Sequence, residues 1–192
     1  SCLNVNKDVD ILFVIDNSGS MGEEQANLSA NFGEFISVLE EPQVGANYRI
    51  GVTTTDNGNP RCQGTSPEGG ALQLTSCRGR ELDFLFNGNP PVDAFDEACT
   101  SICSPETHAA LANGVVPTPT DKDPTEQPRP WIQSIEGVTN LPEGVTPTEA
   151  FQCFGPQGVA GCGFEQPLES MYKSLSRANL EGGEEFGFLR DS

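Results

Sequence analysis

Basic residues are scarce in this chain of 192 residues. Ten Lys and Arg residues stand against 28 Asp and Glu residues, which gives a formal net charge of −18. A protein that binds nucleic acid needs a basic surface to neutralise phosphates, so this deficit argues against nucleic-acid partners. The acidic excess permits binding of cations or of partners bridged by a metal, and it equally suits a solubilising surface.

Several signatures of membrane proteins and enzymes are also missing. No stretch of about 18 or more apolar residues occurs, so the sequence predicts no membrane span. The chain has no Gly-Lys-Ser/Thr loop that would cradle nucleotide phosphates. Its single histidine, His108, lies in an irregular region, and no nucleophile with a paired base is recognisable. We therefore expect a binding or structural protein rather than an enzyme.

The most informative segment is the apolar run from Ile11 to Ile15, which leads directly into Asp16. A continuous apolar run predicts a strand buried on both faces, as in parallel sheets that are covered by helices. Ser18 and Ser20 follow Asp16 on a loop that contains glycine. Open α/β sheets hold their ligand sites at the carboxyl ends of such strands, so we expect these three side chains to share one site.

Oxygen ligands of this kind suit a hard divalent cation, Mg²⁺ first, with Ca²⁺ or Mn²⁺ as alternatives. One carboxylate and two hydroxyls neutralise the ion only in part, so coordination positions remain for water or for an incoming anion. We therefore predict a metal site formed by Asp16, Ser18 and Ser20 that accepts a carboxylate from a protein partner.

The segment from Ile11 to Gly22 resembles the D-x-S-x-S signature of the von Willebrand factor A domain, including the preceding strand and the acidic helix start that follows. The resemblance, closest to A domains of exported bacterial proteins, implies an open, doubly wound, mostly parallel α/β sheet of Rossmann-like form. It also implies a metal-ion-dependent adhesion site and an extracellular role in adhesion or protein binding. The alternative is a structural subunit of a surface filament, pilus or sheath, in which the metal braces the fold.

In this family two further loops reach the metal. The second loop supplies a Thr, but the matching region, residues 160–166, contains none. Glu165 or a water could replace that Thr, or Glu165 could simply begin the following helix. The third loop supplies an Asp after a central strand that this sequence does not contain. The resemblance thus covers the first two strand–helix units and the second site loop.

The C-terminal strands of such a domain are missing from this sequence. A sheet without a central strand exposes a strand edge and a helix face. We therefore expect the remainder of the domain to come from a C-terminal continuation, intact or cleaved, or from a second chain. The prediction is one partial domain over residues 1–192.

Regular elements are predicted on either side of a long irregular region. A helix is expected from Glu23 to Glu40, and a strand from Asn47 to Thr55 that ends at Asp56, which we expect to cap a turn. A second helix is expected from Glu165 to Ala178. The first helix should bury Leu28, Phe32, Phe35, Ile36 and Leu39, and the second Leu168, Met171, Tyr172 and Leu175.

Residues 57–150 are rich in Pro, Gly and Cys and are predicted to form an insertion with little regular structure. A brief helix is expected around residues 105–113, and Trp131 and Ile132 should anchor the insertion on the main body. Two disulfides and packing of Leu82, Phe84 and Phe86 should hold it together.

Seven cysteines in a loop-rich sequence favour disulfides and hence an oxidising location: extracellular, cell-surface or periplasmic. Nearest-neighbour pairing is the simplest arrangement, although sequence alone does not fix connectivity. It would join Cys62 to Cys77, Cys99 to Cys103 and Cys153 to Cys162, leaving Cys2 for a partner outside the chain. A weaker alternative is a metal site formed by Cys99, Cys103 and His108.

Overall fold

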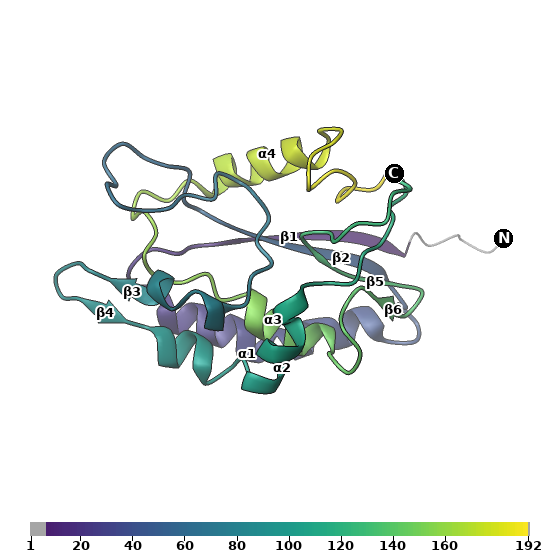
Figure 1. The fold of residues 1–192 in the computed structure, drawn as a ribbon, viewed down its shortest axis with the longest axis horizontal. Helices are drawn as coiled ribbons and strands as arrows, with labels where there is room; N and C mark the ends of the chain where they lie inside the picture. The colour runs from purple at the N-terminus through teal and green to yellow at the C-terminus, as the bar shows by residue number, and fades with distance from the viewer. Residues whose placement is uncertain (1–6, 192) are drawn as a thin grey trace.

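The computed structural model describes residues 7–191, and it contains an open sheet between two helical layers (Figure 1). The four strands lie in the order β1-β2-β5-β6. Their bounds are Asp8–Ile15 for β1, Asn47–Thr54 for β2, Ile132–Ile135 for β5 and Val138–Thr139 for β6. One face is covered by α1 (Gly22–Glu40) and α3 (Pro147–Phe154), and the other by α4 (Pro167–Ala178).

Smaller elements lie between β2 and β5. A separate ribbon pairs β3 (Leu85–Phe86) with β4 (Val92–Asp93), and α2 (Pro105–Ala110) packs near α3. Single helical turns occupy Cys77–Gly79, Glu81–Phe84, Asp96–Thr100 and Leu111–Asn113.

The sequence predicts a mostly parallel sheet, but the main sheet is mixed. β1 and β2 are parallel, with Asp8 opposite Asn47 at one end, whereas β5 is antiparallel to β2 and to β6. β5 and β6 are joined by Glu136 and Gly137, which both have positive φ, of 51° and 77°. Such a two-residue turn joins antiparallel strands only. β1 lies at one edge of the sheet.

The predicted helix after β1 and the predicted strand β2 are both confirmed. Phe32 and Ile36 of α1 are buried as expected, while Phe35 remains 39% exposed. The ring of Phe32 stacks on Phe151 of α3 with centroids 3.6 Å apart, and Phe13 of β1 lies 5.1 Å from the same ring. This aromatic cluster joins β1, α1 and α3, and so fixes where the carboxyl end of β1 lies.

α4 packs on the sheet through small residues, not through its predicted apolar face. Ser170, Ser174 and Ala178 are buried, and Ser174 Oγ donates to the carbonyl of Gly70 at 2.6 Å. The predicted buried face was wrong, because helical periodicity identifies an apolar stripe but not the surface that meets it. The stripe lies outside: Leu168 is 75% exposed, Met171 41% and Tyr172 66%, and Leu175 is half-buried.

The segment from residue 57 to residue 150 is more integrated than an insertion with little regular structure. Its residues 132–139 supply β5 and β6 of the main sheet, so that part of the prediction was wrong. The predicted short helix is confirmed by α2 and the turn after it. Trp131 and Ile132 are fully buried, as expected of an anchor. Phe84 is also buried, whereas Leu82 is exposed.

Residues 7–191 contain three disulfides, but the nearest-neighbour pairing was wrong. The bonds are Cys62–Cys162, Cys77–Cys99 and Cys103–Cys153. Folding brings cysteines together across as many as 100 positions, because loops from distant parts of the chain meet beside the sheet. Cys99 and Cys103 are each bonded to other cysteines, so they do not form a metal site with His108. Cys2 lies outside the described residues.

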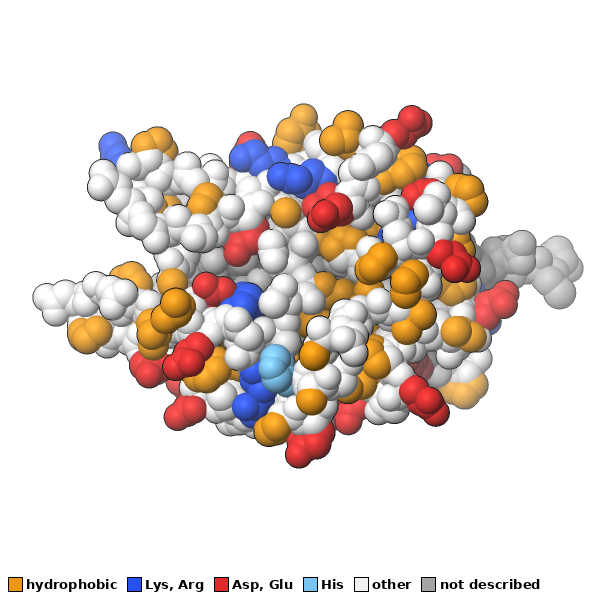
Figure 2. Space-filling model, viewed as in Figure 1, with side chains coloured by type: hydrophobic (Ala, Val, Ile, Leu, Met, Phe, Trp, Pro, Cys, Tyr) orange, Lys and Arg blue, Asp and Glu red, His pale blue; other side chains and the backbone are white. Residues whose placement is uncertain are grey.

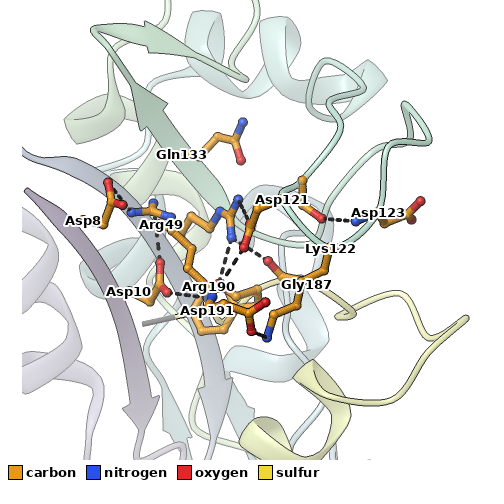
Figure 3. A network of polar contacts seen from close by, with 12 residues as sticks. Asp8, Asp10, Arg49, Asp121, Lys122, Asp123, Gln133, Gly187, Arg190 and Asp191 are labelled. Carbon is orange, nitrogen blue, oxygen red and sulfur yellow. Dashed lines mark hydrogen bonds and ion pairs between the residues drawn. The ribbon is translucent and has the colours of Figure 1, made fainter.

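Two arginines join the amino ends of β1 and β2 to the last described residues (Figure 3). Arg49 of β2 donates through Nη1 to the carbonyl of Gly187 at 2.6 Å, and through Nη2 to Asp121 Oδ1 at 3.0 Å. The backbone N–H of Arg190 donates to Asp10 Oδ2 at 2.9 Å, and its guanidinium lies 3.4 Å from Asp10 Oδ1. The C-terminal segment is thereby held against the start of the sheet.

This network predicts a specific response to acid. Desolvation raises the pKa of Asp121, but hydrogen bonding and the positive charge of Arg49 outweigh it, so the net pKa is lowered. Asp121 therefore stabilises the fold above its unfolded-state pKa, and this contribution is lost as the pH falls through the lower, folded-state pKa. We expect the melting temperature of Asp121→Asn to fall less steeply than that of wild type between roughly pH 5 and pH 2. The melting temperatures of both proteins are measured by thermal unfolding at each pH. If the two melting temperatures fall by the same amount over this pH range, the prediction is wrong.

Candidate functional site

Asp16, Ser18 and Ser20 lie on the loop between β1 and α1, at the carboxyl end of β1. Asp16 Oδ1 accepts a hydrogen bond from the N–H of Ser18 at 2.9 Å, and the carbonyl of Ser18 accepts from the N–H of Met21 at 3.1 Å. Successive turns thus hold Asp16 and Ser18 on one tight loop. Ser18 is buried and Ser20 is exposed, and within residues 7–191 no hydrogen bond joins Ser20 to either of the others.

A buried glutamine of α1 holds this loop in place. Gln25 Nε2 donates to the carbonyl of Asp16 at 2.7 Å and to that of Gly158 at 2.8 Å. Its Oε1 accepts from the N–H of Gln157 at 2.8 Å and from that of Gly158 at 3.1 Å. Gln25 is only 3% exposed, so four hydrogen bonds within the protein interior connect the loop after β1 to the loop after α3. No local pattern around Gln25 predicts this role.

The loop after α3 also meets the end of β2. The N–H of Gly161 donates to the carbonyl of Asn17 at 2.8 Å, and a Cβ at Gly161 would overlap with Asn17 Oδ1. Asp56, fully buried after β2, accepts from the N–H of Gly58 at 2.9 Å and from that of Cys162 at 3.0 Å. Asp56 therefore caps the turn as predicted, and it also ties β2 to the loop after α3.

The second site loop, residues 160–166, contains no threonine, and Glu165 is the residue predicted to replace it. Glu165 is exposed and precedes α4, which begins at Pro167, so the prediction that Glu165 begins the helix was wrong by two residues. In the described part of the chain, no hydrogen bond or ion pair links Glu165 to Asp16. Its service as a metal ligand stays a prediction.

These loops border a cleft of about 290 Å³, and Figure 2 shows the surface hollowed between two projections at this end of the molecule. Its walls include Asn17, Glu68, Asp83, Gln157 and Gly161. Asn17 Oδ1 and Gln157 Oε1 are buried without a hydrogen-bond partner in residues 7–191, and burial raises the pKa of Glu68. Residues that carry acceptor oxygens therefore surround the cleft, together with Leu82 and Ala160. Of these residues, Asn17 lies inside the D-x-S-x-S motif and Gly161 inside the second site loop, whereas Glu68, Asp83 and Gln157 carried no sequence signal.

The Asp16 loop offers one carboxylate and two hydroxyls as candidate metal ligands. Within residues 7–191, no group of three or more His, Cys, Asp or Glu residues could hold a metal ion. A cation here would depend on one carboxylate and two hydroxyls, a set that suits Mg²⁺ retaining several waters. Asp16 Oδ2 and the hydroxyls of Ser18 and Ser20 make no hydrogen bond to the described part of the chain, so they are free to act as ligands.

The structure contains a pair of a hydroxyl and a base, Ser76 and His108, that the sequence did not predict. Nδ1 of His108 lies 2.9 Å from Ser76 Oγ, beside a pocket of about 370 Å³. Among the described residues no acidic side chain hydrogen bonds to the other ring nitrogen, so the pair lacks the orienting group of a Ser-His-Asp triad. Ser76 Oγ also lies 3.7 Å from the disulfide sulfur of Cys103. The expectation that the chain is not an enzyme stays a prediction.

Comparison of the chain with models of protein families, with characterised proteins and with solved structures finds no match. Over residues 7–191, no helix is both long enough and apolar enough to cross a membrane. Any functional assignment therefore depends on the geometry and chemistry of the loops at the carboxyl ends of β1 and β2.

Proposed function

We propose that the loop bearing Asp16, Ser18 and Ser20 holds a divalent cation, Mg²⁺ first and Ca²⁺ or Mn²⁺ as alternatives, and that a protein partner completes the site with a carboxylate. The observation that carries the proposal is the set of uncommitted oxygens on this loop, Asp16 Oδ2 and the two hydroxyls. Backbone turns and Gln25 hold the loop in shape before a ligand arrives, which lowers the entropic cost of binding.

The charge of the chain makes a metal bridge useful. At a net charge of −18 the protein repels acidic partners over a distance set by ionic strength. A divalent cation held by a single carboxylate keeps an excess positive charge and open coordination positions, and so it supplies local attraction for a second carboxylate. This is the function of a metal-dependent adhesion or protein-binding module, in agreement with the resemblance to von Willebrand factor A domains. The disulfides suit an extracellular, cell-surface or periplasmic location.

The first test uses Mn²⁺ alone, followed by electron paramagnetic resonance and by water proton relaxation. We expect wild type to bind one ion per chain and Asp16→Asn to bind it about tenfold more weakly or worse. Asn keeps the oxygen that accepts from Ser18, so the turn should survive. The matched control is Asp93→Asn, because Asp93 Oδ1 accepts from the N–H of Phe95 at 3.0 Å in the same kind of turn. Equal affinities in both variants would overturn the proposal.

A second arm tests the incoming carboxylate. A short peptide with a central aspartate should displace metal-bound water and so reduce the relaxation enhancement of the Mn²⁺ complex. The same peptide with asparagine should leave that enhancement unchanged. A chelator should abolish the difference between the two peptides. If both peptides change the relaxation enhancement equally, the ion stabilises the loop but does not bind a partner's carboxylate.

The edge position of β1 favours a second candidate, a structural subunit of a surface filament, pilus or sheath. In such an assembly neighbours would complete the sheet, and the metal would stabilise the fold. Sedimentation of the chain under native and reducing conditions separates the two: a stable monomer in both favours the binding module.

A further inference from the structure

Two acidic residues line the cleft beside the Asp16 loop. Glu68 lies in the loop after β2, and Asp83 lies in the helical turn before β3. Neither lysine nor arginine is among the described residues that line the cleft. Figure 2 shows acidic side chains at the inner end of the hollow between the two projections. The cleft therefore carries negative charge that no basic residue of its own lining neutralises.

Arg80 pairs with Asp83 and leaves Glu68 without an ion pair. Nη1 of Arg80 lies 3.1 Å from Asp83 Oδ2, and Nη2 donates to the carbonyl of Pro156 at 2.6 Å. Nε of Arg80 donates to the carbonyl of Thr75 at 3.3 Å. Within residues 7–191 no ion pair involves Glu68. Because all three nitrogens of Arg80 already have acceptors, Glu68 is the carboxylate that an incoming cation would meet unpaired.

The surroundings of Glu68 disfavour its negative charge. Its Oε2 accepts a hydrogen bond from Thr54 Oγ1, whereas its Oε1 makes none to the described residues. Burial raises the pKa of Glu68, and the hydrogen bond from Thr54 and the charge of Arg80 offset that effect only in part. A positive charge beside a desolvated carboxylate favours its ionised form. Glu68 therefore gains more from a cationic ligand than an exposed carboxylate would.

Two buried amide oxygens in the cleft wall favour the same kind of ligand. Asn17 and Gln157 are 5% and 2% exposed, and Asn17 Oδ1 and Gln157 Oε1 have no hydrogen-bond partner within residues 7–191. The amide group of Asn17 lies against Gly161, which is also part of the wall. The dipole of a buried carbonyl without a donor is weakly screened, because its surroundings have a low dielectric constant. Both oxygens therefore add negative potential at the cleft.

We propose that the cleft binds the ammonium group of a lysine on the protein partner whose carboxylate completes the metal site, with Glu68 as the counter-ion. The identity of this partner rests on the proposed function, whereas the lysine itself would bind with or without the metal. Asn17 follows Asp16 directly and lines the cleft, so the two sites are adjacent. The partner would therefore be recognised by a carboxylate and a lysine that lie close together on its surface.

The lining favours lysine over a metal ion and over arginine. The described residues contain no group of three or more His, Cys, Asp or Glu residues that could hold a metal. Arginine binds a carboxylate best through both oxygens, and one oxygen of Glu68 is already held by Thr54. An ammonium group is a compact charge with three donors, and Leu82 and Ala160 provide apolar contact for its aliphatic stem. A lysine side chain therefore fits this lining best.

The first test uses the whole chain without metal, so it does not depend on the ion. The probes are the blocked peptide acetyl-Gly-Lys-Gly-amide, its arginine analogue, and its norleucine analogue, which is similar to lysine in length but carries no charge. NMR follows the side-chain carboxyl carbon of Glu68 during titration with each peptide. We expect the lysine peptide to bind about tenfold more tightly than the norleucine peptide and to lower the pKa of Glu68. Equal binding of these two peptides, or tighter binding of the arginine peptide, would overturn the proposal.

A matched pair of variants assigns the binding to Glu68. Glu68→Gln keeps an oxygen that accepts from Thr54 and removes the charge, so the fold should be retained while the preference for lysine is lost. Glu106→Gln removes the same charge at an exposed site of α2 outside the cleft, and it should bind the peptides like wild type. An unchanged preference for lysine in Glu68→Gln would overturn the proposal.

A last measurement joins the two sites. A blocked peptide that contains both aspartate and lysine should bind the Mn²⁺-loaded chain about tenfold more tightly than the peptide with aspartate alone or with lysine alone. Equal affinities of the three peptides would overturn the assignment of both groups to one partner. A preference for lysine in a chain that binds no Mn²⁺ would support the lysine site and contradict the metal site, so the two proposals fail separately.

Discussion

A variant with both Cys62 and Cys162 replaced by alanine is expected to lose about 3.5 kcal/mol of stability. These cysteines are 100 positions apart. A disulfide that closes an otherwise unconstrained loop of that length would stabilise the fold by about 4.7 kcal/mol. The other two disulfides lie within the loop and shorten the path between its ends to about 30 residues, so the entropy gained by the unfolded chain is smaller. Denaturant unfolding under oxidising conditions measures the loss.

The matched comparison removes Cys77 and Cys99, which close a loop of similar effective length away from the site. Its stability loss should be comparable, at about 3 kcal/mol. Only the variant lacking Cys62 and Cys162 should also weaken Mn²⁺ binding, because Cys162 lies in the loop that bonds to Asp56. A stability loss below about 1 kcal/mol, or equal Mn²⁺ affinities in the two variants, would contradict this account.

Gln25→Leu is expected to lower the free energy of unfolding by about 3 kcal/mol. Leucine is of similar size but leaves two buried carbonyls and two buried N–H groups without partners. Each unsatisfied buried group costs roughly 1–3 kcal/mol, and rearrangement of the loops recovers part of the total. Because these loops carry Asp16 and Gly158, the variant should also weaken Mn²⁺ binding.

The control for this prediction is Gln43→Leu. Gln43 is exposed and makes one side-chain hydrogen bond, to Glu41, so its replacement should change stability by less than about 0.5 kcal/mol. Thermal and denaturant unfolding should rank the two variants in this order. A Gln25→Leu variant as stable as Gln43→Leu would show that the two loops are held together by other contacts.

The elements that were predictable are those whose local pattern agrees with their packing. The apolar run of β1, the spacing of Phe32 and Ile36 in α1 and the turn at Asp56 each follow from chemistry within a few residues. The exposed stripe of α4 shows the limit of such reasoning. Helical spacing put Leu168 and Tyr172 on one face, but only the tertiary fold shows that this face stays exposed within residues 7–191.

The features that escaped prediction depend on contacts between distant segments. Gln25 and Gln157 are 132 positions apart, and no local pattern marks Gln25 as a clamp. The cysteine pairs depend on which loops meet beside the sheet, so proximity in sequence was misleading. The antiparallel placement of β5 was equally hidden, because the long segment before it contains no regular crossover helix that would have signalled its direction.

The two arginines at the amino end of the sheet have a consequence for how the domain can be displayed. Lys7 and Asp191 both lie at that pole, and β1 extends roughly 26 Å from it to the loop of Asp16. A tether attached at Lys7 or Asp191 would hold the domain at the end opposite the loop of Asp16. The loops at the carboxyl ends of β1 and β2 would then face away from the point of attachment and be accessible to a partner.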